Sequence, residues 1–245
     1  FMDDMDQASI KAGGERSFFV GELAPYAWSR LVDSRVGNQE KLNLYGEALQ
    51  KFSEAKQLPE LFRTIYRAAF LPYRSPETLG LFLKEINYFD YSHPEELGNA
   101  YEYLLSIMSS QGDAGQFRTP RHIITLMVRM LDPKPDESVA DPSCGTAGFL
   151  VSCMEYLLER YSSADGVIRE EVEGPDGKPA ESVTYSGDLL DQTQWNHIKT
   201  QMFHGFDFDN TMLRIAAMNL YMHGVEDPDI HYQDTLAQSF ADRYP

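Results

Sequence analysis

The sequence predicts an α/β protein, in which an all-helical N-terminal domain is followed by the first part of a doubly wound parallel sheet. Two observations predict this fold: residues 38–110 carry helical periodicity, whereas short β-prone runs alternate with helical segments after residue 119. With 245 residues and 42% apolar content, the chain is long enough for one large or two ordinary domains. The loop QGDAG marks the expected boundary, which gives a helical domain over 1–111 and a sheet domain over 112–245.

Apolar residues recur at helical spacing through the N-terminal half. The segment 38–55 places Leu42, Tyr45, Leu49 and Phe52 on one face. The same spacing predicts helices over 58–70, 76–89 and 94–110, and the last of these begins with Pro94 in its first turn. The opening run FMDDMDQ resembles the end of a helix that begins earlier, so we expect this domain to be incomplete at its start.

Strands and helices alternate in the C-terminal half. The expected order is a helix from Pro120, a strand at 138–141, a helix to Tyr161, a strand at 201–207, a helix at 211–224 and a strand at 229–234. Two β-prone arms around 174–177 interrupt this order, and we expect a hairpin insertion at about 165–188. The hairpin is either a solvated excursion or a contact for a partner.

Thr119 and Pro120 stand where the first helix of this half should begin. Threonine is a favourable N-cap and proline is tolerated in the first turn. The pattern is typical of a plain capped helix, although the free N–H groups would also suit a carboxylate ligand. The residues expected to face inward are Ile123, Ile124, Met127 and Met130.

The segment VADPSCGTAGF predicts a strand that carries Asp141 to the carboxyl edge of the sheet, then a turn with Gly145 and Gly148, then a helix. Open α/β sheets bind nucleoside ligands in this geometry, because small residues let the backbone approach the ligand and the helix start offers N–H groups. GxxG by itself is equally typical of a tight turn. The fingerprint GxGxxG and the phosphate loop GxxxxGK[ST] are absent, which argues against nicotinamide and ATP binding.

Acidic residues follow the next two strands. Asp207 could accept both hydroxyls of a ribose, and Asp209 is better placed to cap the following helix. Asp234 could accept an adenine amino group. For each of these residues, capping a helix is the alternative role.

Composition excludes several classes of function. The net charge is −17, from 21 basic and 38 acidic residues, so the surface should repel phosphate backbones. Cys144 and Cys153 are expected to be buried thiols, and the histidines lack the spacing of metal ligands. GxSxG and HExxH are absent, so the sequence gives no support for a hydrolase or a zinc enzyme. No run approaches the about 18 apolar residues of a membrane span, so we expect a cytoplasmic protein.

Four segments in this order, LGNAYEYLLSIMSSQGDAGQFRTPRHI, DPSCGTAGFL, GFDFDNTMLRIAAMNLYMHG and QDTL, resemble the modification subunit of type I restriction-modification systems, an adenine-N6 DNA methyltransferase. The resemblance is close from about Asn99 to Leu236 and loose before residue 90. It implies a Rossmann-like sheet and S-adenosyl-L-methionine as the cofactor. Ala147, where many relatives carry glycine, and the hairpin are departures from the family pattern.

The resemblance also implies the cofactor-binding residues. Asp207 matches the ribose-binding acid and Asp234 the acid beside the adenine ring. The segment on the methionine side comprises Gln116, Phe117, Arg118, Thr119, Pro120 and Arg121. The cofactor loop and the strand before it contribute Asp141, Cys144, Gly145, Thr146, Ala147 and Gly148.

The Asn/Asp-Pro-Pro-aromatic tetrapeptide, which binds the target amine in such enzymes, does not occur in the sequence. We therefore expect a fragment whose catalytic motif lies beyond Pro245. In the complete enzyme, the resemblance implies a flipped adenine whose N6 attacks the methyl group. It implies as partners a specificity subunit, a second modification subunit, a restriction (translocase/nuclease) subunit, and double-stranded DNA mainly through the complex.

Two other functions stay open at this point. One is a methyltransferase of the same fold that acts on RNA or protein, because the cofactor loop is generic. The other is a non-catalytic assembly module, because the tetrapeptide is absent. We expect that this chain alone neither methylates DNA nor binds it tightly.

Overall fold

The computed structural model describes residues 2–58, 60–67, 69–88, 103, 119–173 and 179–237. The chain divides into two compact units, Phe1–Tyr91 and Ser92–Pro245. Apart from Tyr103, the predicted helix over 94–110 lies outside the described residues, as does the boundary expected at residue 111, which stays a prediction. Within the described residues, no helix is long and apolar enough to cross a bilayer.

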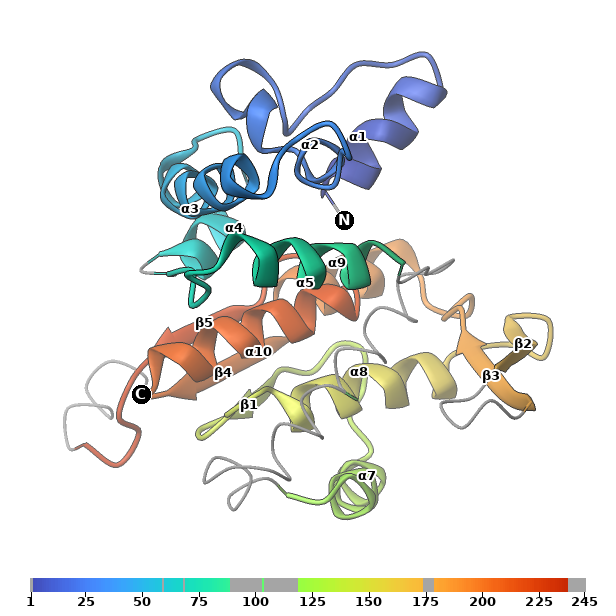
Figure 1. Ribbon diagram of the computed structural model, residues 1–245. Helices are drawn as coiled ribbons and strands as arrows, with labels where there is room; N and C mark the ends of the chain where they lie inside the picture. Colours follow the sequence, from blue (N-terminus) through green and yellow to red (C-terminus); the bar gives the residue numbers. More distant parts are fainter. Residues whose placement is uncertain are drawn as a thin grey trace. The chain divides into compact units, whose positions relative to one another are not determined.

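The first unit is helical. One face of α3 forms its centre, because the Phe52 ring makes edge contacts with Phe19, Tyr26 and Tyr66 at centroid distances of 5.9, 6.4 and 5.0 Å. Phe52 belongs to the apolar face predicted from the helical spacing. The elements of this unit are α1 (Met2–Lys11), the 3-10 helix η1 (Gly21–Tyr26), α2 (Trp28–Leu31), α3 (Asn38–Glu54), α4 (Glu60–Tyr66) and α5 (Pro76–Tyr88) (Figure 1).

The second unit is built on a three-stranded sheet of β1 (Val139–Asp141), β4 (Phe203–Asp207) and β5 (Asp229–Tyr232), in the order β1-β4-β5. Both pairs of strands are parallel, with Asp141 opposite Gly205 and Asp207 opposite Tyr232. The carboxyl ends of the strands therefore meet at one edge. The α/β class is confirmed, and the strands step away from β1 in one direction, as in one half of a doubly wound sheet.

Helices cover the sheet and share one core with it. α8 (Gly148–Arg160) packs on β1, α10 (Asn210–Met222) packs on β4 and β5, and α7 (Arg121–Leu131) packs on α8. α9 (Gln192–Thr200) leads into β4. The largest fully buried side chains of this core include Leu150, Met154, Leu157, Ile198, Met202, Phe203 and Leu220.

The start and the buried face of α7 differ from the sequence prediction. Thr119 is not the N-cap: Pro120 takes that position in an extended conformation, its carbonyl accepts the N–H groups of Ile123 and Ile124, and no side chain caps the helix. The φ of Pro120 is −57°, as in a helix, but its ψ of 136° lies outside the helical range, so the helix begins at Arg121.

The expected inward face of α7 is also mostly wrong. Ile124 and Val128 are buried, whereas Ile123, Met127 and Met130 are 39%, 44% and 77% exposed. The apolar residues form one wide face of this helix, and only the edge of that face with Ile124 and Val128 is buried, so their spacing alone did not select the residues that meet α8.

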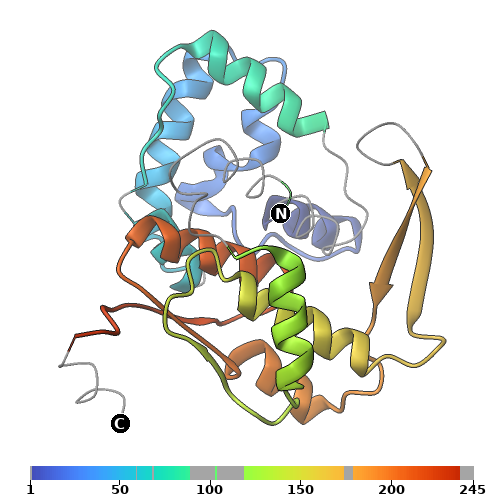
Figure 2. The ribbon, with the colours of Figure 1, turned by 90° about the horizontal axis from the view of Figure 1, so that it is seen from below.

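The predicted hairpin is present as β2 (Val167–Glu173) and β3 (Pro179–Tyr185), which pair in antiparallel register. In the described residues it forms its own two-stranded sheet, and both views show it projecting away from the parallel sheet (Figures 1 and 2). Its base is closed by the hydrogen bond from Ser186 N–H to the Gly166 carbonyl at 3.0 Å. The hairpin is therefore an insertion that contributes no strand to the parallel sheet.

Candidate functional site

The loop between β1 and α8, residues 142–147, is called here the glycine loop. Two of its backbone N–H groups donate to the end of β4: Cys144 to the Phe206 carbonyl at 2.9 Å, and Gly145 to Asp207 Oδ2 at 3.0 Å. Gly145 has φ +52°, a left-handed conformation that glycine adopts without the steric cost of a Cβ. The strand-to-helix turn predicted from the sequence therefore lies directly against the acid predicted from the next strand.

Asp207 holds two segments of backbone. Its Oδ2 accepts Gly145 N–H, and its Oδ1 accepts Asp209 N–H at 2.8 Å. Each carboxylate oxygen can accept a second hydrogen bond, so acceptor capacity remains on both. Asp209 caps α10 by accepting Thr211 N–H at 2.7 Å, as the sequence indicated.

The end of β5 is tied into the same edge. Gln233 N–H donates to the Asp207 carbonyl at 3.0 Å, and Thr235 Oγ1 donates to the Pro142 carbonyl of the glycine loop at 2.9 Å. Asp234 between them is exposed, and its Oδ1 accepts Leu236 N–H at 3.0 Å in a local turn. The ends of all three strands are thus joined by hydrogen bonds.

Negative charge gathers at this edge. Burial raises the pKa of Asp141, and the nearby charge of Asp207 raises it further, against the opposing effect of a 3.0 Å hydrogen bond from Ser143 N–H. Burial, then the charges of Asp141 and Asp207, raise the pKa of the Cys144 thiol to about 12. The edge is therefore electrostatically suited to a cationic ligand, which would reduce the repulsion between the carboxylates.

Both cysteines are free and buried, as expected. Burial, with the charge of Asp141, raises the pKa of Cys153 to about 11. Both thiols therefore stay protonated at neutral pH and are poor nucleophiles. Cys144 presents its side chain to the sheet, since a Cβ added at Gly205 would lie 3.1 Å from its sulfur.

Ala147 is the second left-handed residue of the loop, with φ +65° and ψ +26°, and its side chain is fully buried. This is the position at which the sequence departs from the family glycine. Gly148 begins α8, and a Cβ there would lie 3.5 Å from Ile124 Cδ1 of α7. The first turn of α7 therefore lies beside the glycine loop.

Of the six residues predicted on the α7 side, the structure describes Thr119, Pro120 and Arg121. Gln116, Phe117 and Arg118 lie outside the described residues, and Thr119 is half-buried while Pro120 is exposed. The Arg121 guanidinium is paired with Glu155 of α8 at 2.5 and 2.7 Å. The residues that the structure brings to one edge are Asp141, Cys144, Gly145, Thr146, Ala147, Gly148, Asp207 and Asp234.

Two residues at this edge were missed in the sequence. Phe208 follows Asp207 and is 74% exposed; an aromatic residue between two acids in FDFD was the signal for it. Asn219 of α10 is fully buried, and its Nδ2 donates to the Thr146 carbonyl at 2.9 Å. A single amide within an apolar helical stretch was the signal for Asn219.

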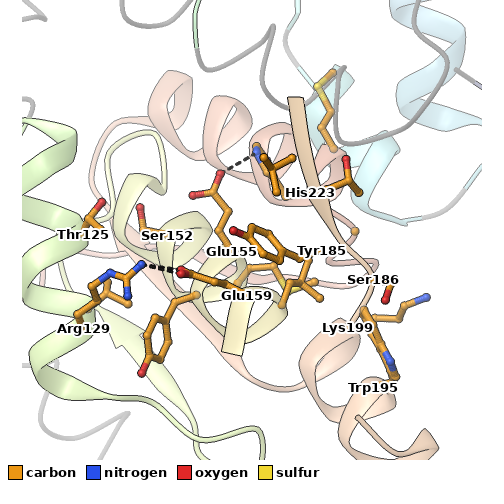
Figure 3. A pocket seen from close by; sticks show the side chains of 18 residues that line it. Thr125, Arg129, Ser152, Glu155, Glu159, Tyr185, Ser186, Trp195, Lys199 and His223 are labelled. Carbon is orange, nitrogen blue, oxygen red and sulfur yellow. Dashed lines mark hydrogen bonds and ion pairs between the residues drawn. The ribbon is translucent and has the colours of Figure 1, made fainter. Parts of the chain in front are cut away.

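A cavity of about 460 Å³ lies elsewhere in this unit, between α7, α8, β3, α9 and the end of α10 (Figure 3). Among its lining residues, Arg129 pairs with Glu159 at 2.7 Å, and His223 Nε2 lies 3.9 Å from Glu155. Lys199 pairs with Glu226, which does not line the cavity. No residue of the glycine loop lines it. The cavity is therefore separate from the candidate site at the strand ends.

In the described part of the chain, no cluster of three or more His, Cys, Asp or Glu side chains has a metal-binding arrangement.

Known proteins resemble this chain over much of its length. Residues 92–243 match the N-6 DNA methylase family. The chain is 29% identical over 158 residues to the methylase subunit of the type I restriction enzyme EcoEI from Escherichia coli, covering 63% of this chain and 26% of that protein. It is 27% identical over 223 residues to the StySPI methylase subunit from Salmonella potsdam, covering 88% and 37%. The chain thus spans well under half the length of these relatives.

Solved structures share the fold. The methyltransferase subunit of a type I restriction-modification system from Streptococcus thermophilus superimposes with a TM-score of 0.63 at 19% identity, covering 99% of this chain and 45% of that one. A chain from a structural study of complex assembly in the type I system gives a TM-score of 0.65 at 18% identity, covering 96% and 43%.

Proposed function

Because the chain belongs to the N-6 DNA methylase family, we propose that its second unit binds S-adenosylmethionine where the glycine loop, Asp207 and Asp234 meet. The complete protein would then be the modification subunit of a type I restriction-modification enzyme and would methylate adenine N6 in DNA, in line with the names of its relatives. The observation that carries this proposal is the hydrogen bond between Gly145 N–H and Asp207 Oδ2, which joins loop and acid into one edge.

The residues present fit the parts of this cofactor. Asp207 retains acceptor capacity for the ribose hydroxyls. Asp234 is exposed and offers an acceptor to the adenine amino group, and the exposed Phe208 ring offers a face on which a purine can stack. The carboxylates of Asp141 and Asp207 favour the positive charge of the sulfonium and the ammonium.

The first turn of α7 would take the other end of the cofactor. No side chain caps this helix, so the leading N–H groups and the helix dipole favour a carboxylate, such as that of the methionine part. Thr119, Pro120 and Arg121 would lie on this side, with Gln116, Phe117 and Arg118 leading into it. We propose this arrangement because Ile124 of α7 lies beside Gly148.

S-adenosylmethionine supplies an electrophilic methyl group on sulfur. The protein would act by binding the cofactor in one orientation and by aligning a flipped adenine with it, because positioning carries much of the rate in such transfers. No Asn/Asp-Pro-Pro-aromatic tetrapeptide occurs in this sequence. We place the group that holds the target amine in a part of the protein beyond Pro245.

The proposed setting is the bacterial or archaeal cytoplasm, in a complex with a specificity subunit, a second modification subunit and a restriction subunit. The relatives include methylase subunits of type I enzymes from Escherichia coli, Salmonella and Methanocaldococcus jannaschii. Because the net charge of −17 disfavours contact with phosphates, we propose that the partner subunits make most of the contacts with DNA.

Isothermal titration with S-adenosylmethionine tests the proposal. The wild-type chain should bind, and Asp207→Asn should weaken binding about tenfold or more, because hydrogen bonds to a charged group contribute about 1.5–3 kcal/mol. Asp209→Asn is the matched control: it also removes one charge at this edge, but asparagine still caps α10, so affinity should stay within about threefold. A folded wild-type chain that produces no heat of binding would refute the proposal.

A further inference from the structure

Asn219 is a buried polar residue in an apolar part of α10. It is 0% exposed, and Ala216, Ala217 and Leu220 around it are also buried. Placing an amide in such surroundings costs free energy unless its polar atoms are hydrogen-bonded, and an apolar side chain would fill the space without that cost. A hydrogen bond of the amide should therefore offset the cost of its burial.

That partner is the glycine loop. Asn219 Nδ2 donates to the Thr146 carbonyl at 2.9 Å, across a separation of 73 residues in the sequence. Thr146 lies between Gly145 and Ala147, the two left-handed residues of the loop, with φ +52° and +65°. The hydrogen bond thus acts on the peptide that joins Thr146 to Ala147, in the most constrained part of the turn.

The backbone conformation of Ala147 explains why the hydrogen bond from Asn219 to Thr146 is needed. The left-handed conformation is unfavourable for alanine because its Cβ approaches backbone oxygen. Rotation of the Thr146–Ala147 peptide would relieve this strain, but it would also turn the Thr146 carbonyl away from α10. The Asn219 amide opposes that rotation and so stabilises the strained form of the loop.

The loop is consequently held from two elements. From β4, Asp207 accepts Gly145 N–H and the Phe206 carbonyl accepts Cys144 N–H. From α10, Asn219 donates to the Thr146 carbonyl. The loop residues between these contacts are the ones that would approach the nucleoside.

We propose that Asn219 is a positioning residue, which holds the glycine loop from α10 in the conformation that receives the cofactor. This inference rests on the proposed function, since it concerns the same S-adenosylmethionine site. Asn219 acts through Thr146 and makes no contact of its own with the ligand.

Two neighbouring truncations test it in the full chain. Asn219→Ala and Leu220→Ala both remove a fully buried side chain from the same helix, so both should lower the denaturant midpoint. Only Asn219→Ala should weaken S-adenosylmethionine binding, by about tenfold in titration calorimetry. Equal affinities of the two variants would overturn the proposal. Asn219→Leu, which fills the space without the amide, provides the same comparison if Asn219→Ala does not fold.

A measurement without ligand separates this inference from the proposed function. Asn219→Ala should speed amide hydrogen exchange at residues 143–148, whereas Leu220→Ala should leave those amides at the wild-type rate relative to the rest of the unit. In a separate binding measurement, adding Ala147→Gly to Asn219→Ala should restore part of the lost affinity for S-adenosylmethionine, because glycine adopts the left-handed form without strain. Wild-type exchange in the loop of Asn219→Ala would exclude the positioning role, even if the wild type binds cofactor. If the wild type binds none, the exchange result still decides the role of Asn219.

Discussion

At the residue scale, the backbone angle of Gly145 predicts a local effect on stability. A Cβ at this position would meet no atom within 4 Å, so the cost of Gly145→Ala comes from its φ of +52° alone, about 1–2 kcal/mol. The measurement is the free energy of unfolding in urea. Gly148→Ala is the matched control in the same segment: its φ is not positive and its Cβ would make an ordinary 3.5 Å contact, so it should be neutral or slightly stabilising. Equal losses for both variants would contradict this explanation.

The raised pKa of Asp141 predicts a pH dependence of stability. A carboxyl whose pKa is higher in the folded state binds its proton more tightly there, so the stabilising contribution is fully present below the unfolded pKa of about 3.9. It is lost as the pH rises through the raised folded value. Asp141→Asn keeps an oxygen for Ser143 N–H but cannot ionise, so it should lose less stability than the wild type between about pH 4 and about pH 7.

The check on Asp141 is urea unfolding of both proteins at the two pH values. A wild type that gains stability relative to Asp141→Asn over this range would show that the folded state favours the ionised carboxylate, contrary to the direction of the pKa shift.

At the scale of elements, the sequence correctly predicted the helices and strands that are flanked by turn-forming residues. β1, α8, β4, α10 and β5 follow in the expected order. Gly224 follows His223, the C-cap of α10, and has φ +89°. α9 was missed because few of its residues are apolar, and only the capping box of Asp191 and Gln194 marked its start. The prediction of the buried residues of α7 was wrong because the apolar face is wide, and tertiary packing decides which part of it is covered.

The hairpin of β2 and β3 should be removable without loss of the sheet. Gly166 and Ser186 are hydrogen-bonded at its base, and Ser163 N–H and Oγ bind the Asp188 carboxylate at 2.9 and 2.6 Å. Replacing residues 167–185 by an Asn-Gly turn keeps these contacts. We expect the circular dichroism of the shortened chain to retain its helical signal and its affinity for S-adenosylmethionine to stay within about threefold, since a loss of one hydrogen bond would exceed this. Loss of cofactor binding by a folded shortened chain would assign the hairpin a role in the site.

At the scale of the whole molecule, the site was predictable only in part. The loop and its acids are local patterns, so the sequence indicated Gly145, Asp207 and Asp234 together. The contacts that hold them are not local: Asn219 reaches Thr146 across 73 residues, and Thr235 reaches Pro142 across 93. No spacing rule marks such pairs, because they arise when separate helices and strands pack.

The net charge of −17 predicts the behaviour of the whole chain toward DNA. Affinity for a duplex comes largely from basic groups that neutralise phosphates and release counterions, and this chain has 38 acidic residues against 21 basic ones. Fluorescence anisotropy with a labelled duplex, at about 150 mM salt, should therefore show no saturable binding below about 10 µM protein. Lowering the salt should change this little, because repulsion between the surface and the phosphates grows as screening falls. Submicromolar binding that weakens steeply with salt would instead reveal a basic surface within the acidic chain, and DNA contact would no longer need to be assigned to partner subunits.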